Sequence, residues 1–244
     1  MKEKIYYFEG ELADNIIITL TDDEFHHLSN VMRSKVHDKI FLFNGNGYFY
    51  HGEIVEMSKK YAKILIISSE QSVAEPKIQL DVYQALVKGD KLSLITQKLT
   101  ELGASNLFLF ESAFCDVKSN TGKQNRLKQI SISAAKQCGR ATVVESDYDI
   151  LSVKKVTEKI GEYDAFFVAY ENADKITLTD ELLNFSGDLK KIAVMIGSEG
   201  GFSEKEIELL KESGAKIVSL GERILRTETA SITCSAVITQ ILKC

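Results

Sequence analysis

The chain has 244 residues, of which 44% are hydrophobic and 27% charged, the balance of a folded globular protein rather than a disordered one. Its formal net charge of −5 argues against a protein held to nucleic acid by bulk charge, although a local basic patch would suffice for phosphate contacts. No apolar run approaches the roughly 18 residues of a membrane span, and no signal-peptide core follows the N-terminus, so we expect a cytoplasmic protein with no membrane partner.

Before the single proline, Pro76, the pattern is mostly that of β-strands. Strands are expected at 15–19, 39–44, 48–57 and 61–68, and the turn sequence 44–47 (NGNG) favours a hairpin. One helix interrupts them. It begins at Thr21, where Glu24 completes the pattern of a capping box, and its apolar face would comprise Phe25, Leu28, Val31 and Met32. Short strands with one helix predict a small β-barrel domain, placed at residues 1–72.

After Pro76, strands alternate with helices. Strands are expected at 78–86, 106–110, 165–170 and 191–196, and helices at 90–102 and 126–138, which Gly103 and Gly139 end. The last two strands are continuously apolar, as strands of a parallel sheet covered on both faces are. This alternation predicts an open α/β sheet over residues 73–244.

A glycine-rich loop follows the strand 191–196. Its residues 197–201 (GSEGG) precede Ser203 and Glu206, which form a second capping-box pattern. Ligands of open α/β sheets bind at the carboxyl ends of strands, so a ligand loop is favoured over a plain turn. Neither a dinucleotide fingerprint nor a phosphate-binding lysine loop is present.

A second loop follows a strand that ends at Gly221. It carries Arg223, Arg226 and Glu228 and leads into the last helix. Two structural interpretations stay open: Thr227 and Thr229 could cap the helix, and the charged residues could form an ion pair. Arginines beside a glycine turn at a strand end nevertheless favour a binding site.

Metal binding is not indicated. Cys115, Cys138, Cys234 and Cys244 form no CxxC pair, and the adjacent His26 and His27 would point in different directions on a helix.

Segments 196–203 (IGSEGGFS) and 220–230 (LGERILRTETA) closely resemble the signature of the small-subunit (16S) ribosomal RNA uridine-N3 methyltransferases of the SPOUT superfamily. Three further regions support the resemblance: 26–33 (HHLSNVMR), 88–103 (KGDK and QKLTELG), and 134–140 (AAKQCGR). The sequence departs from the family pattern at Ser198, where proline is usual, at Val143-Val144, and at His37, which replaces the glycine of a Gly-Asp turn.

The resemblance implies an N-terminal PUA-like RNA-binding β-barrel and a C-terminal SPOUT-type α/β domain with a trefoil knot. It implies a homodimer that methylates 16S rRNA, in the context of the small ribosomal subunit, with S-adenosyl-L-methionine as cofactor. The expected cofactor-binding residues lie in three loops: Tyr170, Ile196, Gly197, Gly200, Gly201, Leu220, Gly221, Ile224 and Leu225.

Methylation of uracil N3 requires loss of its proton. Arg226 is the predicted stabiliser of negative charge on the uracil oxygens, and Glu199 and Glu228 are candidate bases, although support of a loop or helix explains these glutamates equally well. The predicted RNA contacts are basic residues spread along the chain: Arg33, Lys35, Lys88, Arg126, Lys136 and Arg140. Alternatives are ribose 2′-O methylation, a non-catalytic ribosome-assembly factor, and an enzyme that binds another nucleotide.

Overall fold

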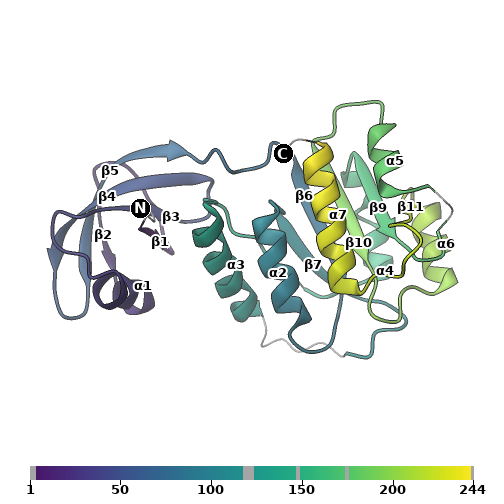
Figure 1. The fold of residues 1–244 in the computed structure, drawn as a ribbon, viewed down its shortest axis with the longest axis horizontal. Coiled ribbons are helices and arrows are strands. Elements are labelled where there is room, and N and C mark those ends of the chain that lie inside the picture. Colours follow the sequence, from purple (N-terminus) through teal and green to yellow (C-terminus); the bar gives the residue numbers. More distant parts are fainter. Residues whose placement is uncertain (1–3, 118–123, 147–148, 174–175, 243–244) are drawn as a thin grey trace. The chain divides into compact units, whose positions relative to one another are not determined.

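The computed structural model describes residues 4–117, 124–146, 149–173 and 176–242, which form two compact units (Figure 1). Unit 1 comprises residues 1–75 together with 135–143, and unit 2 comprises residues 76–134 and 144–244. The division after Glu75 lies close to the predicted end of the first domain at residue 72. The segment 135–143, however, belongs to unit 1 although it is distant in sequence from the rest of that unit.

Unit 1 is built on a mixed five-stranded sheet with the order β1-β3-β4-β5-β2. Its strands are β1 (Ile5–Tyr7), β2 (Ile17–Leu20), β3 (Lys39–Phe43), β4 (Tyr48–Met57) and β5 (Ala62–Gln71). Alternate residues such as Ile40, Leu42 and Ile64 point into one core, as expected of strands with one buried face. In the described residues β1 and β2 are the sheet's edges, so the predicted barrel is a half-barrel.

The predicted N-terminal helix is present but shorter and less regular than expected. Helix α1 (Asp22–His26) continues into a π-helical turn, η1 (His27–Val31). The Thr21 hydroxyl donates to Asp22 Oδ2 (2.8 Å) and makes no capping hydrogen bond, so the predicted capping box with Glu24 is wrong. Val31, predicted to be buried, is 60% exposed, because the wider π turn changes the angular position of the residues that follow it.

Unit 2 is a parallel six-stranded sheet with the order β11-β9-β10-β6-β7-β8. The strands are β6 (Gln79–Ala85), β7 (Asn106–Glu111), β8 (Leu151–Ser152), β9 (Ala165–Ala169), β10 (Lys191–Ile196) and β11 (Lys216–Val218). Strand β10 lies between β6 and β9, and so occupies the middle of the sheet although it comes late in the chain. The predicted open α/β sheet is confirmed.

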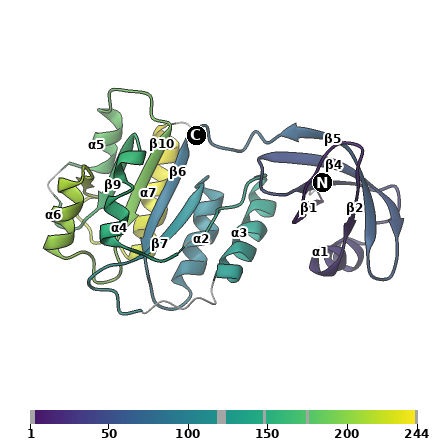
Figure 2. The same cartoon turned by 180° about the vertical axis from the view of Figure 1, so that it is seen from behind.

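Helices cover both faces of this sheet (Figures 1 and 2). One face carries α2 (Lys91–Glu101), α5 (Leu178–Leu183), α7 (Thr227–Ile241) and the first part of α3 (Gln124–Cys138). The other carries α4 (Val153–Thr157) and α6 (Glu204–Glu212), with the short 3-10 turn η3 (Ile160–Glu162) nearby. Successive strand residues alternate between the two cores: Val194 packs on the α7 side and Met195 on the α6 side.

Helix α7 packs between α2 and α5, over β6 and β10. This places the start of the last helix beside the carboxyl end of the central strand. No helix in the described part of the chain is long and apolar enough to cross a membrane. The trefoil knot stays a prediction.

Candidate functional site

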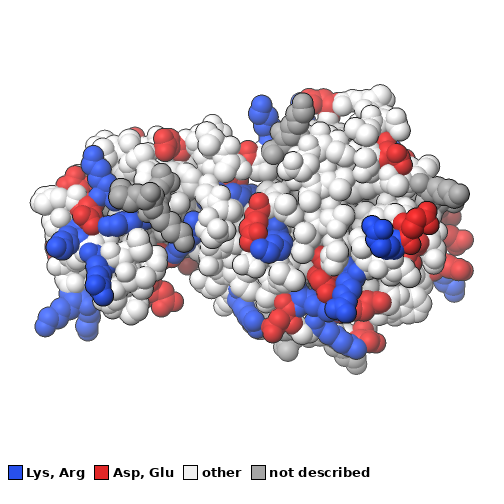
Figure 3. Space-filling model, in the orientation of Figure 1, with Lys and Arg blue, Asp and Glu red and all other residues white. Residues whose placement is uncertain are grey.

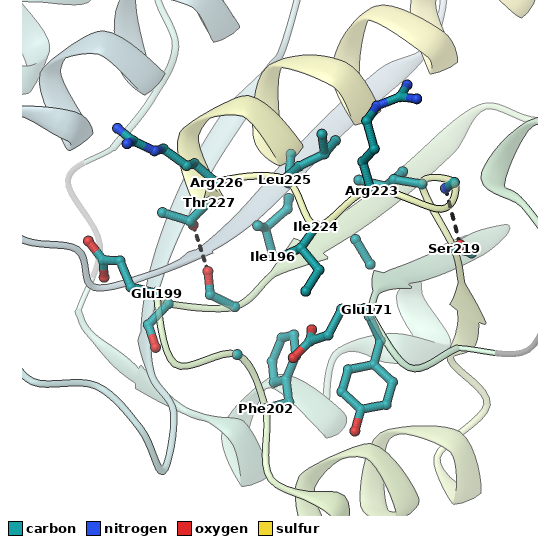
Figure 4. Close-up of a pocket in the computed structure, with 18 of the residues that line it drawn as sticks. Glu171, Ile196, Glu199, Phe202, Ser219, Arg223, Ile224, Leu225, Arg226 and Thr227 are labelled. Atoms are coloured by element: carbon teal, nitrogen blue, oxygen red, sulfur yellow. Dashed lines mark hydrogen bonds between the residues drawn. The ribbon is translucent and has the colours of Figure 1, made fainter.

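A cavity of about 350 Å³ opens at the carboxyl ends of β9, β10 and β11. Residues 169–171 line it after β9, the glycine-rich loop 197–201 after β10, and the segment 219–227 after β11 (Figure 4). These strands are neighbours and parallel, so their carboxyl ends meet at one edge of the sheet. A volume of about 300–1,000 Å³ is typical of small-molecule sites, so the cavity has room for a nucleoside-sized ligand.

The predicted cofactor-binding residues gather at this cavity, with one exception. The lining includes Tyr170, Ile196, Gly197, Gly201, Leu220, Gly221, Ile224 and Leu225. Gly200 instead faces Phe114 and lines a neighbouring hollow with residues 113–116. Ile224 is 86% exposed, which places it at the mouth of the cavity rather than in its interior.

Two glycines in the lining have backbone conformations that other residues rarely adopt. Gly201 has φ +68°, and a Cβ atom there would lie 2.7 Å from Glu171 Oε1. Gly221 has φ +103°, and a Cβ atom there would meet nothing within 4 Å. The first glycine therefore makes room for a neighbouring side chain, whereas the second leaves open space beside the backbone that a ligand can occupy.

A buried hydrogen-bond network joins two of the three lining segments. Thr227, the first residue of α7, donates its hydroxyl to the carbonyl oxygen of Gly197 (2.6 Å; dashed in Figure 4) and accepts a hydrogen bond from Gln84 Nε2 (2.9 Å). Ser231, one turn further along α7, donates to Gln84 Oε1. Thr227, Gln84 and Ser231 are at most 6% exposed. The start of α7 is thereby fixed to the end of β10.

This network decides against one interpretation that the sequence left open, capping of the last helix by Thr227, and brings in Gln84, which was not predicted as a site residue. The N-cap of α7 is Arg226, and Thr227 serves the glycine-rich loop instead of capping the helix. Gln84 lies in β6, in a stretch predicted only as a strand. A polar side chain in a strand buried on both faces was the available signal, because such a group needs hydrogen-bond partners.

Ser198 replaces the family's proline and holds the glycine-rich loop in a way that proline could not. Its hydroxyl donates to the carbonyl oxygen of Phe114 (3.1 Å) and accepts from the backbone N–H of Gly200 (3.3 Å). Gly201 N–H in turn donates to Ser198 O (3.0 Å). The departure from the family pattern therefore adds a link between this loop and the segment after β7.

A small ion cluster lies at the rim of the cavity. Lys91 Nζ is 2.6 Å from Glu199 Oε1 and 3.7 Å from Glu228 Oε2. Burial alone would raise the pKa of Glu199, but Lys91 and backbone N–H groups outweigh it and hold the pKa below its usual range. Neither Lys91 nor its contact with both candidate bases was foreseen, since nothing in the sequence 88–91 distinguishes this lysine from a solvated one.

Arg226 and Arg223 are both exposed and lie at opposite ends of the cavity, with Glu199 on the Arg226 side (Figure 4). Within the described residues, no carboxylate lies within ion-pair distance of Arg226. The ion pair between these arginines and Glu228 that the sequence left open is thus not formed; Glu228 faces Lys91. The Arg226 guanidinium is available to an anionic or polar substrate.

The predicted RNA contacts of unit 1 differ in accessibility. Arg33 and Lys35 are exposed. Lys136 is paired with Glu24 (2.7 Å), both side chains being 22% exposed. Arg140 is buried and paired with Glu75 (3.0 Å), so the expected contact with RNA is wrong for this residue: its charge is already neutralised inside unit 1.

The remaining predicted RNA contacts, Lys88 and Arg126, belong to unit 2. Both are exposed, and they pair with Asp116 (2.6 Å) and Asp90 (3.0 Å). Basic and acidic side chains share the face shown in Figure 3, in keeping with the negative net charge. Surface pairs of this kind are weak, about 0–1 kcal/mol, and exchange readily for contacts with phosphate.

The described residues contain no group of three or more histidine, cysteine, aspartate or glutamate side chains placed to hold a metal ion. Among the described residues, Cys115, Cys138 and Cys234 are not joined in disulfides, and Cys244 lies outside the described residues.

Known proteins resemble the chain over nearly its whole length. Ribosomal RNA small subunit methyltransferase E of Bacillus subtilis is 33% identical over 221 residues, which cover 88% of this chain and 86% of that protein. The protein of the same name from Rickettsia conorii is 30% identical over 244 residues, with 97% and 95% covered.

Solved structures agree. Ribosomal RNA small subunit methyltransferase E from Neisseria gonorrhoeae, bound to S-adenosyl methionine, has a TM-score of 0.86 at 28% identity, with 98% of each chain covered. A Legionella pneumophila protein described as a methyltransferase, in complex with the same cofactor, has a TM-score of 0.87 at 27% identity and the same coverage. Family models match residues 20–67 as an RNA methyltransferase PUA domain and residues 74–239 as an RNA methyltransferase domain. The chain belongs to the RNA methyltransferase family that these two domains define.

Proposed function

We propose that this protein transfers a methyl group from S-adenosyl-L-methionine to N3 of a uridine in the 16S rRNA of the small ribosomal subunit. The observation that carries the proposal is the cavity formed by three loops at the carboxyl ends of β9, β10 and β11. Its lining includes the residues that the resemblance assigns to the cofactor, except Gly200. The names of the relatives from B. subtilis and R. conorii support ribosomal RNA of the small subunit as the substrate.

The residues around the cavity fit a nucleoside cofactor. Ile196, Leu220 and Leu225 supply apolar walls for the adenine, and the open space beside Gly221 lets a ligand approach the backbone. Glu171 extends toward the middle of the cavity (Figure 4) and offers a carboxylate to the hydroxyl or ammonium groups of the ligand. When bound, S-adenosyl-L-methionine supplies a methyl group activated by a positively charged sulfur.

The chain's own contribution to the reaction is positioning and proton removal. The loops 197–201 and 220–225 fix the donor, which is the main requirement for an in-line transfer. Arg226 stabilises the negative charge that develops on the uracil oxygens as the N3 proton leaves. The proton passes to a carboxylate at the rim, Glu199 or Glu228.

Unit 1 contributes to RNA binding in this proposal. Its PUA-domain match and the exposed Arg33 and Lys35 support that role. The resemblance also implies a homodimer and a knotted α7, and the dimer is tested by the mass of the protein in solution, measured by light scattering.

The decisive experiment is incubation of the purified protein with cofactor and with small subunits that lack the modification, followed by mass spectrometry of the nucleosides. We expect 3-methyluridine to appear in 16S rRNA. Appearance of a 2′-O-methylated nucleoside would replace the proposal with the ribose chemistry. Absence of any methylated nucleoside, with cofactor bound in a calorimetric titration, would contradict catalysis.

A further inference from the structure

Lys91 joins three segments of unit 2 that are far apart in the chain. It lies in the first turn of α2, Glu199 lies in the loop after β10, and Glu228 lies in the first turn of α7. Its Nζ is 2.6 Å from Glu199 Oε1 and 3.7 Å from Glu228 Oε2. Because Lys91 and Glu199 also line the cavity, this ion cluster borders the space where the substrate base must meet the methyl donor.

The two carboxylates differ in what else they contact. Glu199 faces Lys88 in addition to Lys91, and Lys88 is itself paired with Asp116. Glu228 is only 14% exposed, and its Oε2 is buried and accepts no hydrogen bond from the described residues. An oxygen in that state has a lone pair free to accept a proton. The Lys91 ammonium lies 3.7 Å from it.

We propose that Lys91 is a positioning residue that holds Glu199 and Glu228 together at the rim of the cavity, where a carboxylate can accept the proton of uracil N3. The inference rests on the proposed function and adds the group that prepares the base. In the reaction the N3–H bond breaks and its proton goes to a carboxylate oxygen. The nitrogen electron pair forms the new N–C bond, and the electron pair of the broken C–S bond stays on the sulfur, which becomes neutral.

The inference has a consequence for the pH dependence. Activity falls at low pH as Glu199 becomes protonated. Lys91 helps to hold the pKa of Glu199 below its usual range, so removing the ammonium raises that pKa. The acid limb of the rate profile therefore moves to higher pH. Lys88, Asp116 and Arg226, the other charged groups near the rim, stay in place.

The test compares K91M, K91R and K98M by kcat/KM for small-subunit RNA from about pH 3 to pH 8, a range that includes the wild-type acid limb because the pKa of Glu199 lies below its usual value. Lys98 is the matched control, because it lies on the same helix, is 35% exposed against 30% for Lys91, and is paired with Glu101 (2.8 Å) away from the cavity. We expect the acid limb of K91M to move to higher pH, that of K91R to stay near the wild-type position, and that of K98M to be unchanged.

A purely structural Lys91 would give a different result: a loss of rate by the same factor at every pH, with the acid limb in place, which overturns the proposal. If K91M is too slow to assay, carbon-detected NMR titration of the Glu199 carboxyl in folded K91M provides the same comparison, and an unchanged Glu199 titration overturns the proposal. If the wild-type protein makes no 3-methyluridine, the proposed function fails and this inference with it.

Discussion

Replacing Thr227 with valine tests how the first residue of α7 holds the cavity together. Valine has nearly the same shape but lacks the hydroxyl, which donates to Gly197 O (2.6 Å) and accepts from Gln84 Nε2 (2.9 Å). The substitution leaves one buried carbonyl and one buried N–H without this partner. Gln84 Nε2 keeps its bond to Ala85 O (3.0 Å).

The expected cost follows from those two groups. A buried polar group that loses its partner costs about 1–3 kcal/mol, so the pair sets an upper limit of about 6 kcal/mol. Gln84 Nε2 keeps its bond to Ala85 O, so we expect less than the upper limit, about 2–4 kcal/mol of lost unfolding free energy. The glycine-rich loop also loses its anchor, so cofactor affinity should fall at least about tenfold, which corresponds to 1.4 kcal/mol.

Urea unfolding followed by circular dichroism measures the first quantity, and calorimetric titration with S-adenosyl-L-methionine measures the second. Two controls bracket the result. T227S keeps the hydroxyl and should retain most of the wild-type stability and most of the cofactor affinity. T239V removes a hydroxyl from the same helix at an equally buried position, where it bonds only to helix carbonyls such as Ser235 O (2.9 Å), and should cost less than about 1 kcal/mol. Stability and affinity of T227V equal to those of T239V would refute the reasoning.

Three further outcomes are expected. Q84L should destabilise the protein by about 2–4 kcal/mol. Urea unfolding of Q84L, T227V and the double variant should reveal a coupling free energy of at least about 0.5 kcal/mol between the two sites. If the losses of unfolding free energy simply add, the two residues do not act as a network. R140M should cost about 3–5 kcal/mol, because it leaves the Glu75 carboxylate, which is only 16% exposed, without its opposite charge. Burial would raise the pKa of Glu75, but Arg140 and neighbouring donors lower it. The pair therefore contributes to the free energy of unfolding above the usual carboxyl pKa, and this contribution is lost as pH falls through the lowered value. The difference in Tm between R140M and the wild type should therefore narrow in acid. R226A should cut turnover strongly with cofactor affinity within about threefold of wild type, while R226K retains part of the rate; equal turnover of R226A and wild type would remove Arg226 from the mechanism.

Regular elements with a strong pattern were predictable in this sequence. The bounds of β4 and β10 agree with those predicted. A hairpin turn marks the start of β4, and a continuous apolar run defines β10. Helices α4 and α5, of five and six residues, were missed, since they are too short to show a helical repeat of apolar residues. The predicted capping box at Thr21 was wrong because a sequence motif shows only which hydrogen bonds are possible. In the structure the Thr21 hydroxyl bonds to Asp22 instead.

For the site, the sequence predicted the loops but not how they are held. Glycines at strand ends identify where a ligand can approach, and those positions line the cavity. The partners of Thr227 and Glu199, namely Gln84 and Lys91, lie more than 100 residues away in the chain, and only the tertiary fold brings them together. For Arg140 the sequence predicted a functional contact that the structure does not support. The sequence shows that the residue is basic, but not that Glu75 already pairs with its charge inside the fold.

The discontinuity of unit 1 bears on how the chain is made. Glu75 accepts hydrogen bonds from the backbone of Ala141 and Thr142, and Gly47 N–H donates to Ala141 O. A nascent chain that has emerged only as far as residue 75 lacks these donors, and a largely enclosed carboxylate without them is costly. The first unit to be translated therefore completes its hydrogen bonding only after residue 143 has left the exit tunnel, so premature termination anywhere between these points should yield a fragment prone to degradation.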